Sequence, residues 1–157
     1  MFKATSKWTG SSLLAEVAVP IETDQSGNRL LNAPRYTITM SLQQGFPIGH
    51  LGSIVARWDG LWKDTTYFDS SEGRGLLNAQ DEQLLPKNTI GMGPHWIHNV
   101  RLAYLTPDES IDVALWVRNV TDEAVKAFSA DLTAFQKTTL HFVGDPRTFG
   151  VTTSIRF

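Results

Sequence analysis

The chain has 157 residues, a formal net charge of -2 and no cysteine. Its length suits one domain, its charge argues against a nucleic-acid surface, and the lack of thiols excludes disulfides and thiolate metal sites. No run approaches the roughly 20 apolar residues that a membrane-spanning helix requires.

Apolar and polar residues alternate along the first half of the chain, which is typical of β-strands with two different faces. Residues 12–21 form a first candidate strand. The clearest strand covers residues 36–43, where every even position is large and apolar and every odd position is Thr, Ser or Gln. Residues 44–50 follow as a tight turn, and the next strand is predicted from His50 to about Phe68.

The second half continues the same pattern. Its predicted elements are a long loop (69–93), a strand (96–104), a short turn (106–109), a strand (111–118), a long loop (119–147) and a last strand (148–157). The best helical candidate, residues 124–135, is assigned to the second loop. Long and short connections therefore alternate, as they do in transmembrane barrels with long extracellular loops and short periplasmic turns.

These features predict an all-β fold, an antiparallel transmembrane β-barrel segment of about six strands that forms an open or partial barrel. One face, on the apolar side of the strands, would contact lipid, and the other, which carries Trp116, would line the lumen. Aromatic residues expected at the membrane interface are Trp58, Trp62, Trp96 and Tyr104. Charged residues expected on the lumen face are Arg57, Asp59, Lys63, Arg101, Asp112, Arg118 and Arg156.

Three blocks of sequence, at residues 27–37, 113–123 and 144–157, occur in an order and spacing that resembles the C-terminal half of TonB-dependent receptors. The first is similar to a return from an extracellular loop into a late strand, the second to the penultimate strand and the third to the last strand. The likeness covers residues 27–157. Its motif residues are Asn119, Thr121, Asp122, Glu123, Asp145, Pro146 and Arg147.

This resemblance implies a place in the outer membrane of a Gram-negative bacterium and import of a siderophore, vitamin, saccharide or similar nutrient. Residues 1–157 would then be the C-terminal part of the barrel domain, with the plug domain and earlier strands absent. In such a receptor Trp116, on the lumen face, could pack against the plug. The N-terminus also lacks the apolar run of a signal peptide. We therefore expect a fragment that does not transport alone. Its expected partners are outer-membrane lipid, the barrel-assembly machinery, the remaining strands and the plug; TonB itself contacts the missing N-terminal part.

The last strand has an expected role of its own. Apolar residues at alternate positions, followed by a terminal aromatic residue, resemble the signal by which the barrel-assembly machinery recognises its substrates. The open edge of such a strand can pair with another sheet. Thr153 departs from the usual apolar residue. The signal residues are Phe149, Val151, Thr153, Ile155 and Phe157.

A different class of protein also fits the alternation: a small soluble β-barrel or sandwich that binds a ligand. In that case the apolar face would fill a closed interior. His95 and His98 would point to opposite faces of one strand, which argues against a joint metal site. No motif for a catalytic nucleophile, a phosphate loop or a dinucleotide site is present, so we expect neither an enzyme nor a cofactor.

Overall fold

The computed structural model describes residues 26–75, 85–133 and 138–157. The strand predicted at residues 12–21 lies outside this range. The elements that lie wholly within the described residues are β-strands and one short 3-10 turn, η1 (Gly49–Leu51). No helix in these ranges is long and apolar enough to cross a membrane.

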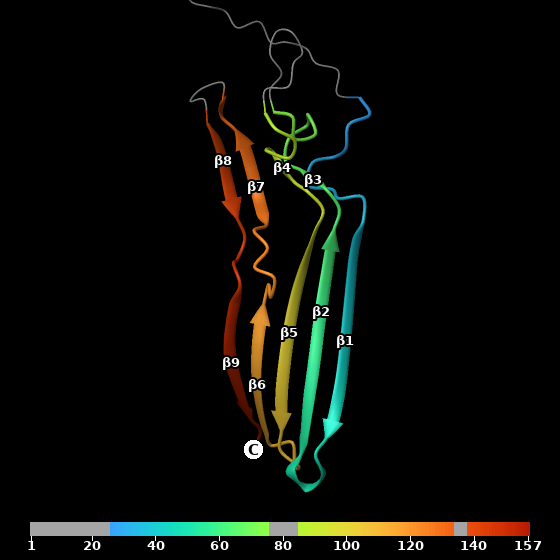
Figure 1. Ribbon diagram of the computed structural model, residues 1–157, viewed down its shortest axis with the longest axis vertical. Coiled ribbons are helices and arrows are strands. Elements are labelled where there is room, and N and C mark those ends of the chain that lie inside the picture. Colours follow the sequence, from blue (N-terminus) through green and yellow to red (C-terminus); the bar gives the residue numbers. More distant parts are fainter. Residues whose placement is uncertain (1–25, 76–84, 134–137) are drawn as a thin grey trace, which may run out of the picture.

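Five long strands form one antiparallel sheet (Figure 1). They lie side by side in the order β1-β2-β5-β6-β9, so β1 and β9 are the edges of the described sheet. The predicted all-β, antiparallel fold is therefore confirmed. The strands are β1 (Thr37–Pro47), β2 (Ser53–Lys63), β5 (His95–Leu105), β6 (Ile111–Arg118) and β9 (Thr148–Ile155).

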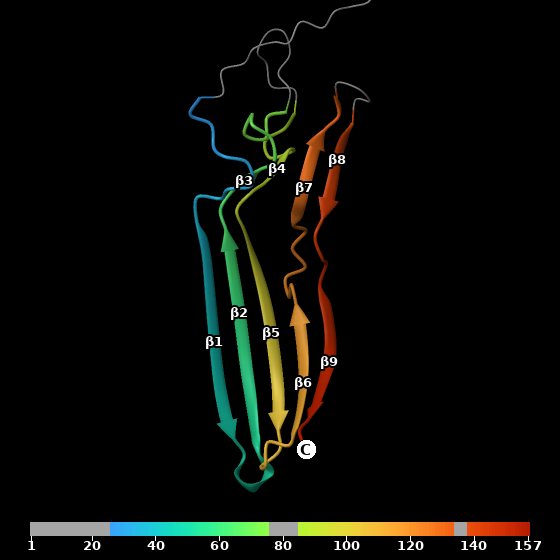
Figure 2. The same cartoon turned by 180° about the vertical axis from the view of Figure 1, so that it is seen from behind.

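The two ends of the sheet differ (Figure 2). At one end, η1 joins β1 to β2, and a turn at residues 106–110 joins β5 to β6. The Tyr104 hydroxyl donates to the Leu51 carbonyl at 2.6 Å and so links the end of β5 to η1. The long connections leave at the opposite end, which we call the loop end. The predicted alternation of short and long connections is present.

The first long connection contains strands that the sequence did not predict. β2 ends at Lys63, before the expected Phe68, and a separate two-residue strand follows, β3 (Thr66–Tyr67). It pairs with β4 (Gly91–Met92), which lies inside the predicted loop 69–93.

The second long connection corrects the prediction of a loop over residues 119–147. β7 (Lys126–Asp131) and β8 (Thr139–Val143) form an antiparallel pair there. The assignment of residues 124–135 to loop was wrong for the part that β7 occupies. Phe128 is opposite Phe142 in this pair, and cross-strand aromatic contacts stabilise such hairpins.

The register of the sheet separates apolar from polar residues in rows across the strands. One row is apolar throughout: Leu42, Trp58, Val100, Val117 and Phe149. The adjacent row points to the other face: Gln43, Arg57, Arg101, Trp116 and Gly150. Because side chains alternate along a strand, the sheet has one apolar and one predominantly polar face.

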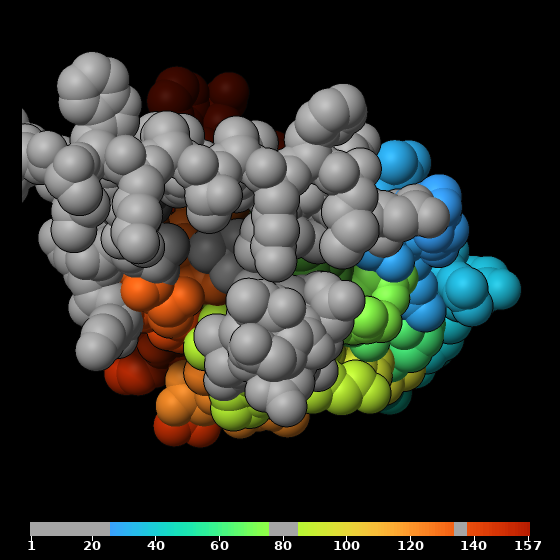
Figure 3. Space-filling model, turned by 90° about the horizontal axis from the view of Figure 1, so that it is seen from above, coloured from blue at the N-terminus to red at the C-terminus, as the bar shows by residue number. Residues whose placement is uncertain are grey.

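The apolar face has no second layer against it among the described residues. The buried apolar residues among those described, Ile90, Ala103 and Ala114, do not lie on this face: the two alanines pair on the polar face, and Ile90 precedes β4. By contrast, Leu42 is 68% exposed and Ile155 is 64% exposed. Seen from the loop end, the coloured segments run from blue beside β1 to orange and red at β7 to β9 (Figure 3). The described strands thus form an open sheet without the filled interior that a soluble barrel requires.

Candidate functional site on the polar face

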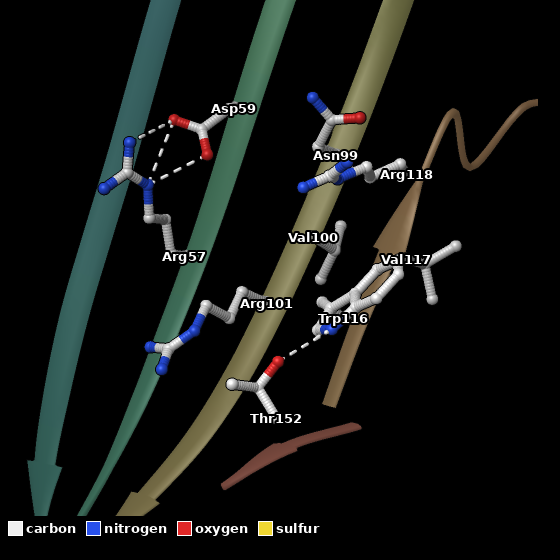
Figure 4. A pocket seen from close by; sticks show the side chains of 9 residues that line it. All are labelled: Arg57, Asp59, Asn99, Val100, Arg101, Trp116, Val117, Arg118 and Thr152. Carbon is white, nitrogen blue, oxygen red and sulfur yellow. Dashed lines mark hydrogen bonds and ion pairs between the residues drawn. The ribbon is translucent and has the colours of Figure 1, made fainter. Parts of the chain in front are cut away.

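The polar face carries a shallow cavity of about 380 Å³ that spans β2, β5, β6 and β9 (Figure 4). We call this surface the polar wall. Arginines contributed by three different strands line it because the register aligns their positions. Its lining residues are Arg57, Asp59, Asn99, Val100, Arg101, Trp116, Val117, Arg118 and Thr152.

Two ion pairs neutralise part of the polar wall. Arg57 Nε and Nη2 donate to the Asp59 carboxylate at 2.8–3.1 Å, and the Ser41 hydroxyl donates to the same carboxylate at 2.6 Å. Arg101 Nη2 donates to both oxygens of Asp112, at 2.9 and 3.2 Å. Hydrogen bonds to ionised groups are stronger than neutral ones, so these pairs fix the side chains in place.

Trp116 is held flat against the polar wall. Its ring lies over Gly150, its partner in β9, where an added Cβ would be 2.5 Å from Trp116 Cζ2. Trp116 Nε1 donates to the Thr152 hydroxyl at 3.1 Å. On the other side, the Arg118 guanidinium carbon lies 5.2 Å from the ring centre, a cation–π contact. Only a glycine in β9 leaves room for this arrangement.

Six charged residues predicted for the lumen share this face: Arg57, Asp59, Lys63, Arg101, Asp112 and Arg118. Lys63 is the last residue of β2 and lines a separate cavity. Arg156 follows β9, and its backbone N–H donates to the Ser110 carbonyl. The predicted grouping of charges on one face is correct for the six residues within the strands.

The aromatic residues predicted for the membrane interface lie on the apolar face at different positions along the strands. Trp62 and Trp96 are opposite each other near the loop end, and Tyr104 lies near the short turns. Trp58 lies between these levels. Its ring stacks on His98, which also stacks on Trp96, with ring centres 5.7 and 5.5 Å apart. The interfacial role of these rings stays a prediction.

The two histidines of β5 do not meet. Their separation by three positions places them on opposite faces, as the sequence indicates. His95 Nδ1 bonds to the Gly93 carbonyl at 2.9 Å, whereas the His98 ring lies between two tryptophans. Within the described ranges, no group of three or more His, Asp or Glu side chains is arranged to hold a metal ion.

The motif residues from two separate blocks converge at the loop end of β6. Asn119 is 5% exposed, and its side chain forms hydrogen bonds with the backbone N–H and carbonyl of Glu123, both at 2.9 Å. It also donates to the Asp145 carbonyl at 3.3 Å. Its own backbone N–H donates to Asn99 Oδ1 at 3.0 Å. Asn119 therefore connects β5, β6 and the approach to β9.

A second contact joins the same two blocks. The Arg147 backbone N–H donates to Asp122 Oδ1 at 2.8 Å, and the two side chains form an exposed ion pair at 4.0 Å. Thr121 and Pro146 lie exposed in the two connections that this contact joins. Asn119 and Asp122 both have positive φ, 51° and 56°, which Asn and Asp tolerate better than most residues. The motif thus shapes the departure from β6 and the return to β9.

The terminal strand is an exposed edge. β9 pairs with β6 on one side, and among the described residues nothing pairs with its other side. Thr153 lies opposite Val113 on the apolar face, so its parity follows the pattern although its side chain is polar. Recognition of this strand by an assembly machinery stays a prediction. The exposed apolar residues here are Phe149, Val151, Ile155 and Phe157.

Several residues that build the polar wall were not predicted from the sequence. Ser41 and Asn99 could have been placed on this face from their odd positions, but their partners depend on the register. Gly150 and Thr152 also share the polar side of the last strand by their even positions, but position alone gives them no role. Gly150 and Thr152 follow Trp116 by 34 and 36 residues in the chain, and the pairing of β6 with β9 brings them into contact with its ring.

No protein-family profile and no curated protein matches the chain. A solved structure does: the ferric yersiniabactin uptake receptor FyuA from Yersinia pestis, with a TM-score of 0.65 and 19% sequence identity. The likeness establishes the fold. It covers 85% of this chain but 18% of the receptor, so the chain spans less than a fifth of the protein it matches. The matched protein is an uptake receptor.

Proposed function

We propose that this chain is the C-terminal barrel portion of an outer-membrane receptor of the TonB-dependent type. Such a receptor would import a siderophore, vitamin, saccharide or similar nutrient. The observation that carries the proposal is a single-layered antiparallel sheet, exposed on its apolar face, that matches an uptake receptor over 85% of the chain. The order of the three sequence blocks supports the same assignment.

The dimensions of the sheet suit a bilayer. β1, β2 and β5 each have 11 residues. At about 3.3 Å per residue and a tilt of about 45°, such a strand covers roughly 26 Å, close to the apolar band of outer-membrane barrels. Lipid would then cover the large apolar side chains of the exposed face, and the polar wall would face the barrel interior.

A five-stranded sheet does not close by itself. In hydrocarbon, each unpaired backbone group at the edges β1 and β9 would cost several kcal/mol. We infer that further strands complete the barrel and that these described strands alone do not transport. The barrel-assembly machinery, the remaining strands and a plug are the partners that this proposal requires.

Tryptophan fluorescence can test which face contacts lipid. Two variants retain one tryptophan each, Trp58 on the apolar face or Trp116 on the polar wall, with phenylalanine at the other four positions. After folding into vesicles, lipids brominated in their acyl chains should quench Trp58 strongly and Trp116 weakly. Acrylamide in the aqueous phase should show the opposite preference.

Equal quenching of both tryptophans by the brominated lipids would contradict the proposal. So would a monodisperse monomer that unfolds cooperatively in the absence of detergent, because that behaviour indicates a self-contained soluble β-protein.

A further inference from the structure

A histidine interrupts the apolar face of the sheet near its loop end. His98 shares this face of β5 with Trp96 and Val100. In the five described strands of the sheet, every other His, Lys, Arg, Asp and Glu side chain takes the polar face. A ring with two hydrogen-bonding nitrogens therefore lies on the side that the proposed function assigns to lipid.

Two tryptophan rings hold the His98 ring in one orientation. Trp58 stacks on it with ring centres 5.7 Å apart and an angle of 24° between the planes, and Trp96 stacks at 5.5 Å and 10°. Gly60, the partner of His98 in β2, leaves the room that this packing needs, because an added Cβ there would be 2.7 Å from the Trp58 ring. The directions of the two imidazole nitrogens are therefore fixed.

The two nitrogens of His98 have different surroundings. Nδ1 is buried and has no hydrogen-bond partner within the described part of the chain. A proton on Nδ1 would be a buried donor without an acceptor, so the neutral ring carries its proton on Nε2. Nε2 is not among the buried unpaired atoms, and it bonds to no described residue. Its N–H group is therefore a donor that is available on the apolar face.

We propose that His98, Trp58 and Trp96, together called the aromatic stack, bind a membrane lipid whose headgroup contains a phosphate. A phosphate oxygen accepts the Nε2–H of His98, and the first carbons of the acyl chains cover the indole rings. This inference rests on the proposed function, because it needs the apolar face to contact a bilayer. It adds the chemistry of a lipid that is bound at one defined place.

The depth of the aromatic stack favours a headgroup over acyl chains alone. His98 is the fourth residue of β5, about 10 Å along the strand from the loop end at about 3.3 Å per residue (Figure 1). With a tilt of about 45°, that is roughly 7 Å of depth, close to the headgroup region. Hydrocarbon offers no acceptor to an N–H group, whereas a phosphate accepts a charge-assisted hydrogen bond.

The apolar surroundings favour a lipid over a free phosphate ester. Trp58 is half-buried and Trp96 is 37% exposed, so both rings present apolar area beside the donor. A ligand with acyl chains gains free energy by covering this area, and a small hydrophilic anion does not.

Nuclear magnetic resonance of the ¹⁵N-labelled full chain in maltoside micelles, which contain no phosphate, can detect this binding. The chain has five indole N–H groups, and Trp58→Phe and Trp96→Phe identify the two signals of the aromatic stack. The probe is short-chain phosphatidylglycerol. Diacylglycerol with the same chains lacks the phosphate, and glycerol phosphate lacks the chains.

Phosphatidylglycerol should shift the two signals in a saturable manner, with an affinity about tenfold or more above that of the diacylglycerol, and glycerol phosphate should leave them in place. His98→Phe retains a ring in the stack but removes the donor. It should weaken the affinity by about tenfold, as expected for loss of a hydrogen bond to a charged group. His50→Phe removes an exposed imidazole at the opposite end of the sheet and should retain the affinity.

Equal affinities for phosphatidylglycerol and diacylglycerol would overturn the inference, as would equal affinities of wild type and His98→Phe. A similar response to glycerol phosphate would overturn the assignment to a lipid, because the acyl chains would then contribute nothing. The lipid-quenching experiment separates these results from the proposed function. Strong quenching of Trp58 together with no preference for phosphate contradicts this inference alone.

Discussion

At the scale of single residues, Asn119 makes the densest set of contacts near the polar wall. Its buried side chain holds two backbone groups of Glu123 and the carbonyl of Asp145. Removing a buried hydrogen-bonding side chain leaves its former partners unsatisfied, which costs more than the bonds themselves contribute. The motif residue with the largest effect on stability should therefore be Asn119.

Asn119→Ala should lower the free energy of unfolding by about 2–3 kcal/mol, measured by urea titration in detergent micelles. Asn32→Ala is a matched control, since Asn32 also has positive φ (55°) but an exposed side chain with no hydrogen bond among the described residues. It should cost about 1 kcal/mol through the backbone alone. Equal losses in the two variants would show that the Asn119 contacts contribute nothing.

Asp108, in the turn between β5 and β6, gives the fold a dependence on pH. The Thr106 hydroxyl donates to its carboxylate at 2.7 Å, and this bond, followed by those from Ser110, holds the pKa of Asp108 below its usual value. A lowered pKa stabilises the folded chain above the unfolded-state value of about 3.9, and this contribution is lost as pH falls through the folded-state pKa.

Asp108→Asn should therefore destabilise the chain at pH 7, and the difference from wild type should close as the pH falls below the usual aspartate range. Urea titrations at a series of pH values measure this difference. Thr106→Val should raise the titration midpoint of the Asp108 carboxyl in ¹³C spectra. A difference that stayed constant from neutral to strongly acidic pH would argue against the turn as its source.

At the scale of strands, tryptophan rings cover glycines on both faces of the sheet. Trp58 lies over Gly60 within β2, where an added Cβ would be 2.7 Å from the ring, and Trp116 lies over Gly150 across β6 and β9. Glycine usually weakens a strand, but here the ring shields its backbone. The cross-strand pair of Trp116 and Gly150 helps to fix the register of β6 and β9, because a shift of one residue would place a side chain under the indole.

Gly150→Ala should lower the free energy of unfolding by about 1–3 kcal/mol, because the new methyl group displaces Trp116 and breaks its bond to Thr152. Adding Trp116→Ala should recover part of this loss, which a double-mutant cycle measures. Gly45→Ala, in β1 with no atom within 4 Å of the added Cβ, should have little effect. Strictly additive losses would contradict the contact between ring and glycine.

At the scale of the whole molecule, the proposal requires two different environments for the two faces. Leu42 and Gln43 are neighbours in β1, but Leu42 belongs to the apolar row and Gln43 to the row of Arg57 and Arg101. Both lie near the middle of their strand, where a bilayer would be driest.

Leu42→Arg should destabilise the chain in phospholipid vesicles by about 2–4 kcal/mol, the cost of a cation at the midplane of an outer-membrane barrel. Gln43→Arg places the same charge one residue away on the polar wall and should change stability by less than about 1 kcal/mol. Urea titration of vesicle-inserted protein compares the two. Similar effects from both substitutions would mean that lipid does not contact the apolar face.

The sequence by itself determined the five long strands of the main sheet, their two faces and the short turns. This information is local, since a period of two residues and turn-forming residues at 106–109 are readable within one segment. It also grouped Arg57, Asp59 and Arg101 on one face. Even the position of Thr153 on the apolar face follows from counting along one strand.

Only the tertiary structure decided which of these residues touch. Asn119 reaches Asp145 across 26 positions, and Trp116 covers Gly150 across 34, because the register of β6 and β9 brings distant segments together. The β7 and β8 pair was missed for the same reason. A strand gains stability from the strand to which it is hydrogen-bonded, and its own sequence does not specify which strand that is.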